Sequence, residues 1–257
     1  MKKRSLLAAG LLLLSGCAAQ PGGGMDPVAG PADSEARARA RVFTDLATAY
    51  YARASYKVAL EELRKAILID NRYGPAYNVF GLIYMELAED RLAEDNFKRA
   101  IELDRTDSEA RNNYGWFLCT RGRYDEGLEQ FAAALRNPLY AQPELAMANA
   151  GECAGMKGDL ALAEANFSKS MKLQPDNADT VLRMAALRFH QGRLLDTQRL
   201  LARHEELSPP TAASLWLGVR LERKLGDRAQ EAAYGLQLRK RFPNSNEAGL
   251  LQSGQFE

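Results

Sequence analysis

The chain has 257 residues, of which 34 are Lys or Arg and 33 are Asp or Glu, so its formal charge is close to zero. Hydrophobic residues make up 46% of the sequence, which is enough for an extensive folded core. The balanced charge gives no indication of the clustered basic surface that nucleic-acid phosphates require, so we expect no nucleic-acid partner.

Residues 1–16 predict a secretory signal that is removed in front of a lipid-attachment site. Cationic residues 2–4 precede an apolar run over residues 6–14, which is much shorter than the ~20 residues of a membrane-spanning helix. Small residues then precede Cys17, as in bacterial lipoproteins. We expect Cys17 to carry a diacylglycerol and an acyl chain, and no other cofactor. The alternative is an ordinary secretory signal in which Cys17 is incidental.

Residues 17–33 predict the lipidated cysteine and a flexible tether. This stretch is rich in Ala, Gly and Pro, which bury too little apolar surface to fold. A coil of about 16 residues reaches ~20–25 Å, enough to lift a domain off the lipid headgroups. An Asp after the lipidated cysteine resembles an inner-membrane retention signal, so Ala18 implies the outer membrane, with the domain on its periplasmic face.

Residues 34–257 predict one all-α domain of helical repeats. Self-similarity at a period of 34 begins near Ala40, and this spacing is typical of tetratricopeptide repeats, in which each copy is a helix pair. Stacked pairs predict a right-handed superhelical solenoid. Two extra residues lie between the third and fourth copies, where Pro138 and Pro143 interrupt the helices. The six expected repeats span about residues 40–73, 74–107, 108–141, 144–177, 178–211 and 212–245.

Two positions of the repeat have a clear steric meaning. Position eight lies where the two helices cross closely, and it holds a small residue in five copies: Ala47, Gly81, Gly115, Gly151 and Ala185, with Val219 as the exception. Position fifteen begins the turn between the helices, where a left-handed backbone favours glycine: Ala54, Ala88, Gly122, Gly158, Gly192 and Gly226.

The first helices of such a solenoid line a concave face that suits an extended peptide or a helix. Positions two, five, nine, twelve and thirteen usually face this groove, and here they combine aromatic, apolar and amide side chains: Tyr51, Asn78, Leu82, Met85, Asn112, Trp116, Cys119, Phe189, Trp216 and Arg220. We expect the partner in the middle of the array, near Trp116 and its neighbouring asparagines. The two tryptophans could equally pack between repeats. For Asn113 and Asn149, contacts between helices are favoured.

Cys119 and Cys153 lie on the first helices of consecutive repeats. In an oxidising periplasm they could form a disulfide across the two-residue insertion. Packed helix axes are ~8–10 Å apart, whereas a disulfide needs Cα atoms within ~7 Å, so two separately buried thiols remain an equal alternative.

No catalytic or metal-binding pattern is found. His190 and His204 have no cysteine or carboxylate at a metal-ligand spacing, and acidic pairs such as Glu61 and Glu62 lie among Arg and Lys on helices. No strand followed by a glycine-rich loop and no local nucleophile with a base is found either. We therefore expect a protein that is not an enzyme.

Four segments are more specific than the repeat pattern: NNYGWFLC at residues 112–119, NPLY at 137–140, NAGECA at 149–154, and SLWLG at 214–218 with LGD at 225–227. With the lipidation motif, they resemble the PilF/PilW family of type IV pilus biogenesis lipoproteins. This resemblance implies a pilotin, an outer-membrane lipoprotein that binds secretin subunits, delivers them with the lipoprotein-sorting machinery and promotes their multimerisation. Pilus biogenesis and twitching motility would then depend on it.

Two other classes remain open from the sequence. A lipoprotein scaffold could recruit or activate peptidoglycan enzymes, and a component of outer-membrane protein assembly could bind unfolded barrel proteins. Neither alternative accounts for the four segments. The sequence does not define the oligomeric state, or whether residues 242–257 cover the last repeat.

Overall fold

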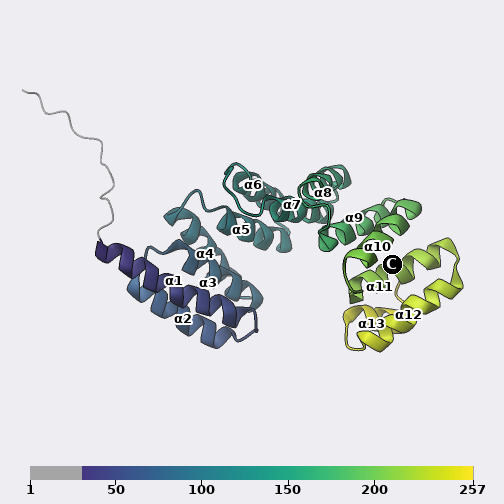
Figure 1. Cartoon of the computed structure of the whole chain (residues 1–257), viewed down its shortest axis with the longest axis horizontal. Helices are drawn as coiled ribbons and strands as arrows, with labels where there is room; N and C mark the ends of the chain where they lie inside the picture. Colours follow the sequence, from purple (N-terminus) through teal and green to yellow (C-terminus); the bar gives the residue numbers. More distant parts are fainter. Residues whose placement is uncertain (1–30, 257) are drawn as a thin grey trace, which may run out of the picture.

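The fold is a curved stack of paired helices. The computed structural model describes residues 31–256, and every regular element in this range is a helix. The helix pairs follow one another along an arch, with the first pairs at one end and the last helices at the other (Figure 1). The predicted signal sequence, Cys17 and most of the predicted tether lie outside the described residues.

Six helix pairs and one single helix make up the described chain. Each pair consists of a first helix, which faces the inside of the arch, and a second helix, which packs behind it. The pairs are α1 (Pro31–Tyr51) with α2 (Tyr56–Ile69), α3 (Gly74–Glu86) with α4 (Asp90–Leu103), α5 (Ser108–Thr120) with α6 (Tyr124–Ala134), α7 (Pro143–Lys157) with α8 (Leu160–Leu173), α9 (Ala178–His190) with α10 (Leu194–Leu207), and α11 (Ala212–Leu225) with α12 (Arg228–Arg241), followed by α13 (Asn246–Ser253).

The structure corrects the expected start of the array and answers the question that the sequence left open at its other end. Helix α1 already begins at Pro31, so residues 31–33 are helical although the predicted tether included them. At the other end, α13 begins 34 residues after the start of α11 and packs against both α11 and α12. It therefore takes the place of a first helix in a seventh repeat, and it caps the last apolar face.

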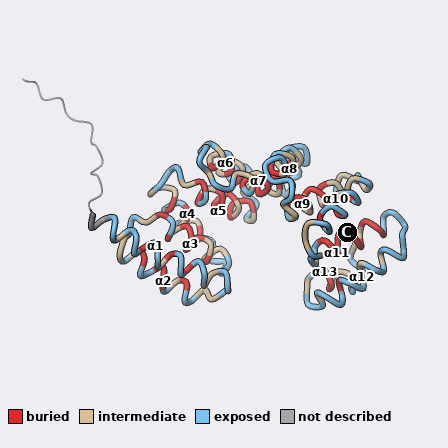
Figure 2. The backbone as a smooth tube through the Cα atoms, viewed as in Figure 1, coloured by how far each residue is buried: buried red, intermediate tan, exposed pale blue. Residues whose placement is uncertain are grey.

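Small residues allow the two helices of a pair to pack closely. A Cβ atom added at Gly81 would lie 2.6 Å from the ring of Phe97, and the same contact recurs at Gly115 with Phe131 and at Gly151 with Phe167. The predicted small position eight is thus the place where a ring of the second helix lies on the first helix. Figure 2 shows that buried positions alternate with exposed ones along the helices.

The last repeat keeps this contact with a shift of one residue. Val219 occupies position eight there and is fully buried, whereas Gly218 carries the close contact, with a built Cβ atom 2.8 Å from the ring of Tyr234. The apparent exception in the sequence is therefore a change of register, since the small residue and its ring partner both move one position earlier.

All six turns within the helix pairs contain a left-handed residue, as predicted. Gly122, Gly158, Gly192 and Gly226 have φ between 72° and 89°. Ala54 and Ala88 adopt φ values of 54° and 57° at the equivalent positions, which is unfavourable for a residue with a Cβ atom.

Carboxylates on second helices hold consecutive repeats together. Glu94 of α4 accepts a hydrogen bond from the hydroxyl of Tyr114, and it pairs with Arg123 and Lys98 at 2.9 and 2.8 Å. Desolvation raises the pKa of Glu94, but the hydrogen bonds from Lys98, Arg123 and Tyr114 outweigh it and lower the pKa to about 2. Glu164 of α8 forms the corresponding pair with Arg188 of α9.

Candidate protein-binding groove

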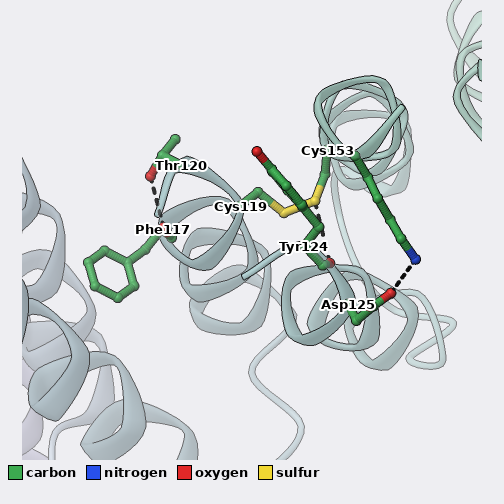
Figure 3. Close-up of a disulfide and its surroundings, with 7 residues drawn as sticks. Phe117, Cys119, Thr120, Tyr124, Asp125 and Cys153 are labelled. Carbon is green, nitrogen blue, oxygen red and sulfur yellow. Dashed lines mark hydrogen bonds and ion pairs between the residues drawn. A yellow bond between two sulfur atoms is a disulfide. The ribbon is translucent and has the colours of Figure 1, made fainter. Parts of the chain in front are cut away.

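A disulfide fixes the middle of the array. Cys119 of α5 and Cys153 of α7 are bonded, with their Cα atoms 5.5 Å apart, which is within the usual range for a disulfide. Figure 3 shows the two side chains pointing toward each other, with Tyr124 beside them. The open alternative from the sequence, two separate thiols, is therefore not what the structure contains.

The bridge lies in a tightly packed environment. Both cysteines are buried in one cluster with Phe131, against which Trp116 and Tyr124 pack. Gly127 of α6 faces the sulfur of Cys119, and a Cβ atom added there would lie 2.3 Å from that sulfur. The disulfide thus leaves no room for a side chain larger than glycine at position 127.

A hollow of about 330 Å³ opens next to the bridge on the concave face, and four consecutive first helices contribute to it. Trp116 of α5 forms one wall, and residues of α7, α9 and α11 form the remainder. The lining is mainly apolar with three charged side chains: Trp116, Glu152, Asp179, Leu182, Arg183, Ala186, Ala213 and Leu217. A second hollow, of about 460 Å³, is adjacent and shares Glu152, Arg183 and Ala186 with the first as lining residues.

The charged residues of the hollow are not equivalent. Arg183 donates from Nε to Asp179 at 2.7 Å, so these two charges largely compensate each other. Within the described part of the chain, no cationic side chain pairs with Glu152, which borders both hollows. The hollow therefore offers an unpaired carboxylate between two apolar surfaces.

Four asparagines form a continuous hydrogen-bonded chain along the first helices. Asn113 donates to Asn78 at 3.1 Å, Asn112 donates to Asn113 at 3.3 Å, and Asn149 donates to Asn112 at 3.1 Å. Arg183 extends the chain with a longer contact of 3.5 Å to Asn149. This chain connects α3, α5, α7 and α9, so its amides serve contacts between repeats.

Several residues predicted to line the groove are instead part of the packed interior. Asn78 and Asn112 are each only 3% exposed, because they belong to the asparagine chain. Trp216 is 9% exposed and stacks on Phe256, with ring centroids 5.6 Å apart. Cys119 and Phe189 are also buried in the core clusters. Tyr51, Leu82 and Met85 are half-buried and pack against the cores of the first repeats.

Of the predicted groove residues in the described chain, Trp116 lines the first of these two hollows, and none lines the second. Leu182, Glu152 and Ala213 were missed although they occupy positions five, nine and two, because the selection favoured aromatic and amide side chains. Leu217 and Arg183 lie at position six, which the usual groove pattern omits. No signal in the sequence distinguishes this position from an interior one.

The geometry of the concave face suits the binding of a protein segment. The described residues contain no group of three or more His, Cys, Asp or Glu side chains that could hold a metal ion. In the same part of the chain, no helix is long and apolar enough to cross a membrane. What the concave face presents is an apolar surface with an aromatic wall and one unpaired charge, which are the elements of a peptide-binding groove.

The fold and this groove define a tetratricopeptide-repeat protein of the kind that binds other proteins. Family models described as tetratricopeptide repeat match residues 74–107 and 96–129. Type IV pilus assembly protein PilF of Pseudomonas aeruginosa is 29% identical over 211 residues, which cover 82% of this chain and 84% of that protein. The chain belongs to the PilF/PilW family of type IV pilus assembly proteins.

Two solved structures agree with this assignment. The crystal structure of PilW, titled a widely conserved type IV pilus biogenesis factor, superposes with a TM-score of 0.75 at 29% identity and covers 83% of this chain and 98% of that one. The structure of Pseudomonas aeruginosa PilF superposes with a TM-score of 0.72 at 28% identity and covers 86% and 99% of the two chains.

Proposed function

We propose that this protein is a lipid-anchored pilotin for the type IV pilus secretin. It would hold secretin subunits in its concave groove, accompany them with the lipoprotein-sorting machinery, and promote their multimerisation at the inner leaflet of the outer membrane. The lipid on Cys17 would supply the membrane anchor, and the following Gly- and Pro-rich residues would supply reach.

The observation that carries this proposal is the hollow beside Trp116 in a chain of the pilus assembly family. An aromatic wall gives a large contact area with few rotatable bonds, which is typical of residues that dominate binding energy. The unpaired carboxylate of Glu152 favours a partner segment that carries Lys or Arg next to its apolar anchor. The compensated pair of Arg183 and Asp179 adds little net charge.

Binding of purified secretin subunits to groove variants tests the proposal. We expect Trp116→Ala to weaken binding by about 30-fold, the effect of losing a hot spot worth roughly 2 kcal/mol. Glu152→Lys should weaken it further at low salt, because it replaces attraction by repulsion. Leu195→Ala is the matched control, since this side chain is 64% exposed on the second helix α10. Unchanged binding by both groove variants, with intact helical melting, would contradict the proposed groove.

A further inference from the structure

The end of the described chain occupies the concave face of the last repeat. Helix α13 ends at Ser253, and Gly254 follows with a left-handed φ of 71°, which turns the chain back toward α11. The next residues bring Phe256 onto Trp216, and the two rings stack with an interplanar angle of 24°. The chain itself thus supplies an aromatic occupant for a groove position.

Three side chains of α11 hold Phe256. Trp216 stacks on its ring, the guanidinium carbon of Arg223 lies 3.7 Å from the ring centroid, and Arg220 donates from Nε to its backbone carbonyl at 3.1 Å. Trp216, Arg220 and Arg223 follow one another at spacings of four and three residues, so they form one stripe of the helix. This stripe therefore contacts both the ring and the backbone of Phe256.

The charges of this stripe are poorly compensated. Arg223 pairs with Glu231 at 2.8 Å. Arg220 and Lys224, by contrast, have no carboxylate partner among the described residues, and both cations instead lie within 5 Å of the Phe189 ring. Burial lowers the pKa of Arg220, because no neighbouring carboxylate offsets its desolvation. The outer nitrogens of this guanidinium are therefore available to a further acceptor.

We propose that this face of α11, defined by Trp216, Arg220 and Arg223, is a second peptide-binding site, specific for an aromatic residue followed by an acidic one in an extended segment of a partner protein. In the free protein it is occupied by the chain's own Phe256, which Glu257 follows in the sequence. A partner segment must displace this residue, so the tail acts as an internal competitor. The site is distinct from the hollow beside Trp116, and the inference does not require that the partner be the secretin.

The competition has a predictable size. A segment tethered beside its site has an effective concentration in the millimolar range, whereas an isolated aromatic dipeptide contact has an affinity of ~100 µM or weaker. The tethered residue should therefore weaken the apparent affinity of a free peptide by about tenfold. Removing the Phe256 ring should therefore raise the apparent affinity for a free peptide by about tenfold.

A fluorescently labelled peptide with the sequence LQSGQFE, which corresponds to residues 251–257, serves as the probe for the full-length protein. We expect it to bind Phe256→Ala about tenfold more tightly than the wild type. The double variant Phe256→Ala with Arg220→Gln should lose this gain, as should a probe in which Ala replaces the phenylalanine. Gly254→Ala should give an intermediate gain of about fivefold, because its left-handed backbone disfavours alanine and loosens the tail without removing the ring.

The outcomes separate a binding site from simple capping. If the peptide binds Phe256→Ala no better than the wild type while both proteins melt alike, the proposal is overturned, and Phe256 merely covers the last repeat. If Phe256→Ala lowers the melting temperature, Gly254→Ala provides the test, and no gain by that variant would overturn the proposal. Secretin binding is measured separately with the Trp116 variants, so either proposal can fail while the other stands.

Discussion

The disulfide between Cys119 and Cys153 should account for a large part of the stability of the central repeats. The cross-link closes a loop across a sequence separation of 34 residues. The chain-entropy relation for a loop of that length gives a stabilisation of about 4 kcal/mol at 25 °C, relative to the reduced chain. We expect Cys153→Ala to remove most of this, and roughly 1 kcal/mol more where truncation of the buried sulfur leaves a small cavity.

The pattern across variants is as informative as the magnitude. Cys119→Ala, Cys153→Ala and the double variant all break the same bond, so each should cost nearly the same. A repeat array does not unfold as one unit, which makes a local probe necessary. Trp116 packs against the cysteine cluster, and in a Trp216→Phe background it is the single tryptophan of the chain.

The assay is therefore urea unfolding followed by the fluorescence of Trp116, under oxidising conditions and with a thiol reductant. The oxidised wild type should show the highest midpoint, while reduction should shift it toward that of the double variant and leave the double variant itself unchanged. The reasoning would be refuted by a wild-type midpoint that is insensitive to reduction, or by single-variant costs that add up in the double variant.

Three further predictions concern the packing, the turns and the charges. Gly127→Ala should destabilise the protein by more than about 2 kcal/mol in chemical denaturation, because the added Cβ atom would collide with the Cys119 sulfur. Gly155→Ala is the control: its Cβ atom would meet nothing nearer than 4.0 Å, so this variant should be neutral or stabilising. Ala54→Gly and Ala88→Gly should each raise stability by roughly 0.5–1 kcal/mol in the same assay, since glycine relieves the left-handed strain; a loss of stability would contradict this. Glu94 has a pKa of about 2 in the folded protein, below its value in the unfolded chain, so its contribution to stability is present above about pH 4.5 and is lost as the pH falls toward 2. Glu94→Gln should therefore flatten the acid side of the profile of unfolding free energy against pH. An unaltered profile would contradict the role of Glu94 in acid stability.

The sequence was sufficient to predict the repeats because their signals are local. The first residues of α3, α5, α9 and α11 are those expected from the period of 34, and the turn residues adopt the predicted left-handed backbone. Each of these features depends on steric requirements within one helix pair. The capping helix α13 follows the same period, but it has only eight residues and the described part of the chain shows no second helix after it, so the repeat pattern alone did not reveal it.

The groove could be predicted only in part, because exposure on the concave face depends on neighbouring repeats. The pattern of positions placed both Trp116 and Asn112 in the groove. In the structure Trp116 lines a hollow, whereas Asn112 forms an interior link to Asn149. Trp216 is covered for a different reason: Phe256, which stacks on it, lies 40 residues away in the sequence and is brought back by a turn at Gly254. Contacts of this kind have no period to detect.

The most direct test of the proposed pilotin role is the state of the secretin in a strain that lacks this gene. Secretin monomers and detergent-resistant multimers are separated from fractionated inner and outer membranes. The account predicts that outer-membrane multimers are lost or mislocalised, that the wild-type gene restores them, and that Cys17→Ala and Trp116→Ala restore them less well than Leu195→Ala. Unchanged outer-membrane multimers in the deletion strain would contradict the account and would favour a scaffold for peptidoglycan enzymes instead.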